Sequence, residues 1–255
     1  MVQEPREGTG QALWLARDEV DSEEQMLVVL GDTIVDFDVE SVIRSGCHGV
    51  GVKKVDDPRN FGVAEINEEG MVTRLHEKPN IPKSNMALVG VYYFHRAGDI
   101  METLDAIIGA GERIRDEYNL TDALSRMVSK GAKVRAFQVG NWYDCGNKNS
   151  LLETNAVLLK RTVPSPQGFA FNNTIIIPPV SIAPGCDISN SIIGPNVSIG
   201  ERTIIKSSII SDSIIGSFSQ LETAVLNQSV VGSDSYLKGL SQSLNIGDST
   251  EIDFS

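Results

Sequence analysis

Apolar positions follow two different periods along the chain. Up to about residue 160, apolar runs of strand length alternate with stretches in which apolar residues recur every three or four positions, a pattern that predicts strands and helices. We expect helices at Gln11–Val20, Val39–Ser45, Asp99–Gly109, Leu120–Lys130 and Ser150–Lys160, and strands at Gln25–Leu30, Gly49–Val55, Gly62–Asn67, Met71–Glu77, Met86–Phe94 and Val134–Val139. Strands and helices in this order predict an α/β domain, with helices on the faces of a mainly parallel sheet.

The pattern changes after a linker at Arg161–Gly168 that is rich in Pro and Ser. Aliphatic residues then recur every five or six positions, and small or turn-forming residues follow most of them. These aliphatic positions are Ile176, Ile182, Ile188, Ile193, Ile199, Ile205, Ile210, Ile215, Leu221, Leu226, Val231 and Leu237. A six-residue step predicts a triangular solenoid of roughly four coils, above the minimum of about three. The segment resembles the left-handed parallel β-helix of hexapeptide-repeat proteins.

Composition narrows the possible functions. A net charge of -12 argues against binding to nucleic acid or to an acidic membrane surface, because both depend on clusters of Lys and Arg. The cysteines Cys47, Cys145 and Cys186 form no Cys-x-x-Cys spacing, so we expect neither a disulfide framework nor a metal site built on Cys. No apolar run reaches the length of a membrane span and the N-terminus is polar, so we expect a cytoplasmic protein.

The positions of the histidines indicate whether the hexapeptide repeat is catalytic or structural. In many β-helix enzymes that transfer an acyl group from coenzyme A, a histidine near a coil junction acts as general base. Here His48, His76 and His95 all precede the repeat region. We therefore expect the β-helix to be structural and to supply a contact between subunits of a homo-oligomer.

Two segments near the N-terminus could bind a nucleotide. In Gln3–Ala12, several glycines allow the backbone to approach a flat ligand, and a helix N-terminus follows. Met26–Ile34 is an apolar strand that ends in Gly31 and Asp32. Ligands gather at the carboxyl ends of strands in an open α/β sheet, so Asp32 is well placed to hold a cation. The alternative is that Asp32 only forms a turn or caps a helix.

Two further segments complete a recognisable order. The third comprises Phe61–Val63, Glu77–Pro79, Pro82–Asn85 and Gly90–Tyr92, and the fourth comprises Glu117–Asp122 and Trp142–Gly146. Together the four segments and the hexapeptide tail resemble the sugar-1-phosphate nucleotidyltransferases, in particular the glucose-1-phosphate thymidylyltransferases whose long form carries a C-terminal left-handed β-helix. The resemblance covers nearly the whole chain and implies a Rossmann-like, mainly parallel sheet ahead of the β-helix.

The resemblance also implies a role for each matching residue. Gln3, Gly8 and Gly31 would bind the nucleotide, and Asp32 and Asp144 would hold a catalytic Mg²⁺. The residues implied for the sugar-phosphate pocket are Gly62, Glu77, Lys78, Leu88 and Gly90. Among these, Glu77 would accept hydrogen bonds from sugar hydroxyls, and Lys78 would act in catalysis by pairing with the phosphate. Two converging carboxylates repel each other unless a cation lies between them, and hard oxygen ligands suit magnesium.

The implied reaction is an in-line attack of a sugar-1-phosphate oxygen on the α-phosphorus of a nucleoside triphosphate, with release of pyrophosphate. Such a transfer needs alignment of two anions and neutralisation of charge more than covalent help. We expect glucose-1-phosphate as the sugar substrate. We expect dTTP or UTP as the nucleotide, because Gln3 and Gly8 do not separate thymine from uracil.

One part of the family pattern has no counterpart in this chain. Family members begin with a strand and a Gly-x-Gly-Thr-Arg-Leu loop that holds the β- and γ-phosphates. Nothing before Gln3 matches it, and Gly8–Gly10 lacks the following arginine. We therefore expect a nucleotidyltransferase domain at 1–162 that lacks its first strands and exposes a sheet edge, followed by the β-helix at 163–255. Either the chain is a fragment of an active enzyme, or it is a non-catalytic sugar-nucleotide-binding or regulatory subunit that assembles through the β-helix.

Overall fold

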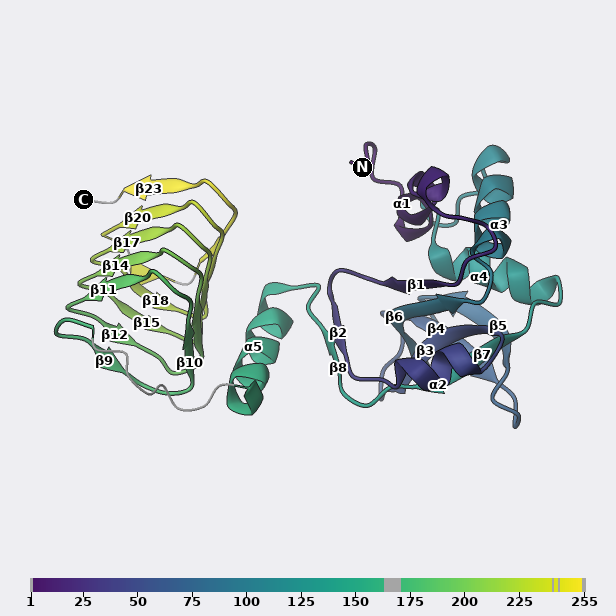
Figure 1. Ribbon diagram of the computed structural model, residues 1–255, viewed down its shortest axis with the longest axis horizontal. Coiled ribbons are helices and arrows are strands. Elements are labelled where there is room, and N and C mark those ends of the chain that lie inside the picture. Colours follow the sequence, from purple (N-terminus) through teal and green to yellow (C-terminus); the bar gives the residue numbers. More distant parts are fainter. Residues whose placement is uncertain (1, 163–170, 240, 243, 254–255) are drawn as a thin grey trace. The chain divides into compact units, whose positions relative to one another are not determined.

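The chain forms two compact units, Met1–Tyr143 and Asp144–Ser255 (Figure 1). A computed structural model describes residues 2–162, 171–239, 241–242 and 244–253. Most of the linker expected at Arg161–Gly168 lies outside these residues, and the domain boundary at 162/163 stays a prediction. None of the described helices has the length and apolar composition needed to cross a membrane.

The N-terminal unit combines a sheet with four α-helices among its described residues. The strands are β1 (Met26–Val29), β2 (Thr33–Val35), β3 (His48–Lys54), β4 (Gly62–Ile66), β5 (Val72–Glu77), β6 (Met86–Phe94), β7 (Val134–Gln138) and β8 (Trp142–Asp144). The helices are α1 (Thr9–Leu15), α2 (Val39–Arg44), α3 (Ala97–Gly109) and α4 (Leu120–Ser129), with a 3-10 turn η1 at Arg17–Glu19. Every strand and helix expected in this unit is present. We did not expect β2 and β8, because three residues carry too little alternation to predict a strand.

The sheet is mixed rather than mainly parallel. Its order is β5-β4-β6-β3-β7, with β1 also paired to β6. Within this order β3 and β7 run parallel, whereas β1, β3 and β4 all pair antiparallel with β6. Parallel neighbours need a crossover of about a dozen residues or more, and the loops that join β3, β4, β5 and β6 are shorter than that. The short loops therefore favour antiparallel pairing over most of the sheet.

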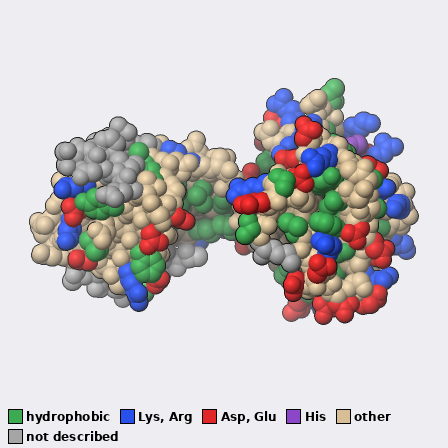
Figure 2. Space-filling view, turned by 90° about the horizontal axis from the view of Figure 1, so that it is seen from above, with side chains coloured by type: hydrophobic (Ala, Val, Ile, Leu, Met, Phe, Trp, Pro, Cys, Tyr) green, Lys and Arg blue, Asp and Glu red, His purple; other side chains and the backbone are tan. Residues whose placement is uncertain are grey.

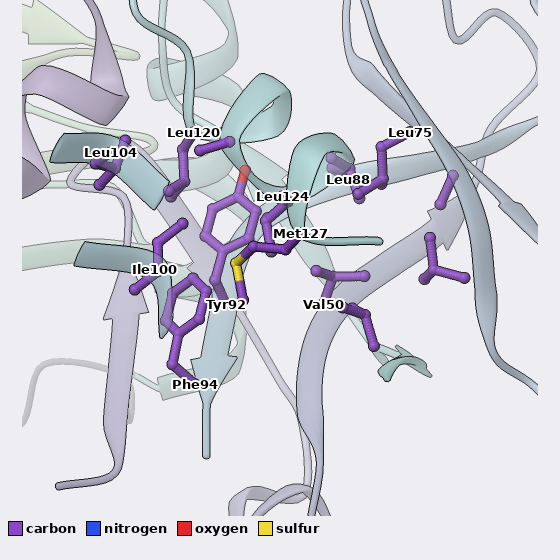
Figure 3. Packing of buried hydrophobic residues seen from close by; sticks show 14 of the residues in the cluster. Val50, Leu75, Leu88, Tyr92, Phe94, Ile100, Leu104, Leu120, Leu124 and Met127 are labelled. Carbon is purple, nitrogen blue, oxygen red and sulfur yellow. The ribbon is translucent and has the colours of Figure 1, made fainter. Parts of the chain in front are cut away.

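The core of this unit lies between the sheet and helices α3 and α4 (Figure 3). Phe94 on β6, Ile100 and Leu104 on α3, and Leu124 on α4 are at most 1% exposed. The spacing of Ile100 and Leu104 places both on one face of α3. Burial of each such side chain contributes up to about 1.5–3 kcal/mol, so this cluster fixes the elements that carry the candidate site.

Strand β1 lies at an edge and exposes apolar side chains. Among the described strands it pairs only with β6. Leu27 and Val29 on β1 are 44% and 47% exposed, and Val39 and Ile43 on α2 are 40% and 42% exposed. The described residues thus cover the apolar side chains of β1 and α2 only in part, and the absence of the first strands stays a prediction.

The C-terminal unit is helix α5 (Lys148–Thr162) followed by a parallel β-solenoid with three faces. One face contains β10 (Val180–Ile182), β13 (Val197–Ile199), β16 (Ile214–Ile215), β19 (Val230–Val231) and β22 (Asn245–Ile246). The second contains β11 (Asp187–Ser189), β14 (Ile204–Lys206), β17 (Gln220–Glu222), β20 (Tyr236–Lys238) and β23 (Glu251–Asp253). The third contains β9 (Ile175–Ile176), β12 (Ile192–Ile193), β15 (Ile209–Ser211), β18 (Val225–Asn227) and β21 (Ser241–Gln242).

The predicted hexapeptide positions form the interior of this solenoid. All of them are buried except Ile176, which is partly buried and packs against the same cluster. Buried serines at the corners are paired between coils. The backbone N–H of Ser208 donates to Ser191 Oγ, and the N–H of Ala224 donates to Ser208 Oγ, both over 3.1 Å. The solenoid therefore satisfies its buried hydroxyl groups while stacking aliphatic side chains.

Candidate active site

Gly62 lies in close contact with residues that are distant in the sequence. It stands on β4 opposite Glu77 on β5 in the antiparallel register. A Cβ atom placed on Gly62 would lie 2.8 Å from Leu88 Cδ1, 3.1 Å from Glu77 Oε2 and 3.1 Å from Thr121 Oγ1. The absence of a side chain at residue 62 thus lets a carboxylate, a hydroxyl group and an apolar side chain pack closely around it. Gly62, Glu77, Leu88 and Thr121 are called here the Gly62 cluster.

A buried phenol, that of Tyr92, contacts the Gly62 cluster through a hydrogen bond with Thr121. Burial is the main cause that raises the pKa of Tyr92, and the negative charges of Glu77 and Asp32 raise it further, whereas a hydrogen bond with Thr121 opposes them. Tyr92 therefore keeps its proton at physiological pH and pairs with Thr121. Glu77 itself is 14% exposed, so its carboxylate faces a partly desolvated space.

A more open, polar pocket adjoins Glu77 through the next residue. It has a volume of about 400 Å³ and is lined by Asp57, Arg59, Asn60, Lys78, Pro79, Asn80 and Arg115. Arg115 Nη2 donates to the backbone oxygen of Lys78 over 2.8 Å. Lys78 and Arg115 have φ angles of +43° and +55°. Residues other than glycine rarely adopt this conformation, and it occurs preferentially at functional sites.

The charge of this pocket suits an anion. Lys78 and Arg115 contribute two cations, and Arg59 contributes a third that pairs with Asp57 over 2.6 Å. The Arg59 guanidinium lowers the pKa of Asp57 to about 2, so this carboxylate is ionised at neutral pH. Acidic and basic side chains are interspersed over the visible face of the unit (Figure 2). A phosphate in this pocket would therefore be attracted by the local cluster of cations and not by the overall field.

The Gly-rich N-terminal segment is held against the chain just before α4. Gln3 Nε2 donates to the backbone oxygen of Gly8 over 3.0 Å and to Gln11 Oε1 over 2.6 Å. Gly8 has a φ angle of +105°, and a Cβ atom there would lie 2.7 Å from the backbone oxygen of Tyr118. The structure therefore brings Gln3 and Gly8 together, and their contacts with a nucleotide base stay predictions.

Gly31 and Asp32 form an exposed turn between β1 and β2. The backbone N–H of Leu30 donates to the oxygen of Gly90 over 2.9 Å. Gly90 has a φ angle of +75°, and a Cβ atom there would lie 2.7 Å from Thr33 Oγ1. Gly90 thus allows β6 to approach the turn that carries Asp32. This packing role is visible in the geometry, and contact between Gly90 and a sugar stays a prediction.

Asp144 is the last residue of β8, which pairs with β2 in a two-stranded sheet. Its Oδ1 atom accepts a hydrogen bond from the Gly146 N–H over 3.0 Å. Among the described residues, no three or more His, Cys, Asp or Glu side chains are grouped to hold a metal ion. Asp32 lies in the N-terminal unit and Asp144 begins the C-terminal unit, so their pairing around Mg²⁺ stays a prediction.

Three residues near the Gly62 cluster and the cationic pocket were not among the predicted site residues. Trp142 packs edge-on against Phe61, with ring centroids 5.0 Å apart, and its buried Nε1–H has no hydrogen-bond partner among the described residues. Buried donors are nearly always paired, so this one is an exception. Thr121 and Trp142 stand inside quoted motifs, whereas Arg115 precedes its motif and no sequence pattern marks it.

Comparisons with known proteins agree with this geometry. The chain is 31% identical over 206 residues to the glucose-1-phosphate thymidylyltransferase of Streptomyces antibioticus, which covers 78% of this chain and 55% of that protein. It is 36% identical over 182 residues to the bifunctional protein GlmU of Methanocaldococcus jannaschii, which covers 70% of this chain and 42% of that protein. The chain thus spans about half the length of these curated relatives.

Solved structures lead to the same group of enzymes. A Bacillus anthracis protein assigned as a glucose-1-phosphate thymidylyltransferase, solved with sucrose, matches with a TM-score of 0.53 and 28% identity over 66% of each chain. A UDP-glucose pyrophosphorylase in complex with UDP-glucose matches with a TM-score of 0.53 and 25% identity, over 62% of this chain and 64% of that one. The family model described as nucleotidyl transferase matches residues 1–161, and the chain therefore belongs to the nucleotidyl transferase family, in which its relatives are sugar-1-phosphate nucleotidyltransferases.

Proposed function

We propose that this chain forms part of an enzyme that makes a nucleoside diphosphate sugar and pyrophosphate from a sugar-1-phosphate and a nucleoside triphosphate. The proposed substrates are glucose-1-phosphate and either dTTP or UTP. The observation that carries the proposal is the Gly62 cluster, whose Glu77 Oε1 lies 4.0 Å from Lys78 Nζ in the cationic pocket that Arg115 also lines. Hydrogen-bonding groups beside a cationic pocket match a sugar that bears one phosphate.

The chain's own residues would bind and align the sugar-1-phosphate. Glu77 accepts hydrogen bonds from sugar hydroxyls. Lys78 and Arg115 offset the charge of the phosphate. An oxygen of this phosphate then bonds to the α-phosphorus of the nucleotide, while the bond from that phosphorus to the bridging oxygen breaks and pyrophosphate leaves. Alignment and charge neutralisation supply most of the rate in such transfers.

We further propose that Asp32 and Asp144 hold Mg²⁺, since ionised carboxylates are the hard oxygen ligands that this ion prefers. Bound magnesium would neutralise charge on the nucleotide phosphates. Gln3, Gly8 and Gly31 are the proposed nucleotide contacts. A cytoplasmic location and a homo-oligomeric state are also proposed, the first because the cysteines are free and scattered.

Calorimetric titration of the chain with glucose-1-phosphate tests the sugar site. Gly62→Ala should weaken binding by about tenfold or more, because the added methyl group overlaps Leu88 and crowds Glu77. Gly109→Ala is the matched control, since a Cβ atom there meets no atom within 4 Å. If the wild-type chain does not bind glucose-1-phosphate, or if Gly62→Ala binds it equally well, the proposed site is wrong.

Pyrophosphate release in the presence of Mg²⁺, glucose-1-phosphate and each nucleoside triphosphate tests the reaction. Turnover with dTTP or UTP would establish catalysis by this chain and identify the base. Binding of glucose-1-phosphate without turnover would favour the alternative of a non-catalytic, sugar-nucleotide-binding or regulatory subunit.

A further inference from the structure

A chain of side-chain contacts leads from the Gly-rich N-terminal segment to the loop between α3 and α4. Gln3 Nε2 donates to Gln11 Oε1 over 2.6 Å, and Gln11 Nε2 donates to Glu7 Oε2 over 2.8 Å. The other carboxylate oxygen of Glu7 pairs with Arg113 Nη2. These four side chains are called here the Arg113 network.

Arg113 directly precedes a tight turn that carries a residue of the cationic pocket. Ile114 and Glu117 exchange two backbone hydrogen bonds, over 3.0 and 3.2 Å. The two residues between them, Arg115 and Asp116, have φ angles of +55° and +64°. Turns with two positive φ angles favour Asn and Gly, so Arg and Asp are strained here and depend on the surrounding contacts to keep this conformation. Residues 114–117 are called here the Arg115 turn.

The Arg115 turn is held at its tip and at its base. At the tip, Arg115 Nη2 donates to the backbone oxygen of Lys78 over 2.8 Å. At the base, Arg113 pairs with Glu7 and lies over the ring of Tyr118, 4.9 Å from its centroid. The backbone N–H of Tyr118 also donates to the backbone oxygen of Glu7, over 2.7 Å. Glu7 therefore fixes both sides of the base, and one of its two links is the ion pair with Arg113.

The ion pair between Arg113 and Glu7 belongs to a network. The Arg113 side chain is 41% exposed, whereas the Glu7 side chain is only 20% exposed. Isolated pairs on the surface contribute little, in part because two flexible side chains must be ordered to form them. Here Gln11 already orders the Glu7 carboxylate, so the pair with Arg113 forms on a partner that is held in place.

We propose that Arg113 is a positioning residue that couples the nucleotide segment at Gln3 to the cationic pocket at Arg115. The inference rests on the proposed function, in which Gln3 contacts the base and Arg115 pairs with the phosphate. A base bound at Gln3 restrains the Arg113 network, which then holds the Arg115 turn in the conformation that lines the pocket. The sugar-1-phosphate has less of the turn to order, and such an effect gives positive coupling. Coupling is reciprocal, so each ligand tightens the binding of the other by the same factor.

Titration calorimetry with glucose-1-phosphate, in the absence and in the presence of saturating thymidine or uridine, tests the coupling. A nucleoside carries no phosphate, so it neither reacts with the sugar phosphate nor repels it. In the wild type, the nucleoside should lower the Kd of glucose-1-phosphate about fivefold, at the lower end of typical coupling. In Arg113→Ala each ligand should still bind alone, and the nucleoside should leave the Kd of glucose-1-phosphate unchanged.

Two further variants separate coupling from a loss of structure. Arg17→Ala is the matched control and should keep the wild-type coupling, since Arg17 also lies over an aromatic ring, that of Trp14, and pairs with a carboxylate, that of Asp18, within its own segment. Arg113→Lys can still pair with Glu7 and should keep part of the coupling. A merely structural role of Arg113 would instead weaken glucose-1-phosphate binding equally with and without the nucleoside.

Hydrogen exchange at the amides of Ile114 and Glu117, whose hydrogen bonds close the Arg115 turn, gives a second readout. Bound nucleoside should slow this exchange in the wild type and not in Arg113→Ala. Coupling that survives in Arg113→Ala, or binding of both ligands without coupling in the wild type, would overturn the inference and leave the proposed function intact. If the wild type does not bind glucose-1-phosphate at all, the proposed function fails and the inference fails with it.

Discussion

The two units of this chain differ in how their residues are brought together. In the N-terminal unit, the Gly62 cluster combines Gly62, Glu77, Leu88 and Thr121, which come from three strands and a helix. In the solenoid, each interior residue stacks on its counterpart in the next coil, as Ile188, Ile205 and Leu221 do. A repeat makes the position of a residue readable from the sequence, whereas a pocket depends on the order in which strands pair.

This difference has energetic consequences. The N-terminal unit has a large cluster that joins the sheet to α3 and α4, so a change at one place affects many elements. Each coil of a solenoid contacts only its neighbours, and stability is close to a sum of local terms. The two units should therefore respond differently to equivalent substitutions.

The largest expected effect is a loss of stability in the solenoid, and it tests whether each coil depends only on its neighbours. Ile205→Ala removes a fully buried side chain and should lower the local free energy of unfolding by about 2–5 kcal/mol. Ile209→Ala, at an exposed position on β15, should change it by no more than about 0.5 kcal/mol. Hydrogen exchange should speed up in the coils next to Ile205 and remain unchanged in distant coils. Faster exchange spread evenly over all coils would contradict the nearest-neighbour picture.

The second largest expected effect is a loss of ligand binding at the cationic pocket of the N-terminal unit. Arg115→Ala should weaken glucose-1-phosphate binding by roughly 10- to 100-fold, because a hydrogen bond to a charged group is worth about 1.5–3 kcal/mol. Arg74→Ala removes the same charge from an exposed position on β5 and serves as the control. Equal losses in the two variants would show that Arg115 acts only through net charge. Titration calorimetry at two salt concentrations separates these cases.

The smallest expected effect is a pH dependence of the N-terminal unit. Burial lowers the pKa of His48 below 6.5, although Asp99 opposes this shift with its charge and with a contact of 3.2 Å, while His95 adds to it. The folded state therefore binds a proton at His48 less readily than the unfolded state does. Stability from this group is fully present above pH 6.5 and is lost as the pH falls through the folded pKa.

Urea unfolding between pH 5 and 8 measures this effect. The free energy of unfolding should fall toward pH 5 in the wild type and fall less in His48→Gln. His76→Gln, at an exposed histidine, is the control and should follow the wild type. If the free energy of unfolding depends on pH in His48→Gln as it does in the wild type, His48 does not cause the pH dependence.

Much of the fold could be predicted because its signals are local. Strand β6 has the predicted limits Met86–Phe94, since its long apolar run is bounded by polar residues. Helix α1 ends at Leu15, short of the predicted Val20, because the chain tightens into a 3-10 turn at Arg17–Glu19. The antiparallel pairing of β6 was not predicted, since strand direction depends on loop paths that an apolar pattern does not encode.

The candidate site could be predicted only in part. The family resemblance implies Gly62, Glu77 and Leu88, and the structure brings them together. Arg115 was not chosen, because a single arginine in a charged loop carries no pattern. Its importance comes from the hydrogen bond to the Lys78 backbone and from the pocket that both residues line.

The sequence by itself determined the solenoid interior, because a fixed repeat maps each aliphatic residue to one inward position in every coil. It also determined the main helices and strands of the N-terminal unit, whose apolar periods are local. Tertiary structure alone decided that the Arg113 network joins the N-terminal segment to the Arg115 turn. It also decided that Lys78 and Arg115 share a pocket, because contacts between distant residues depend on strand order and loop paths and not on any local period.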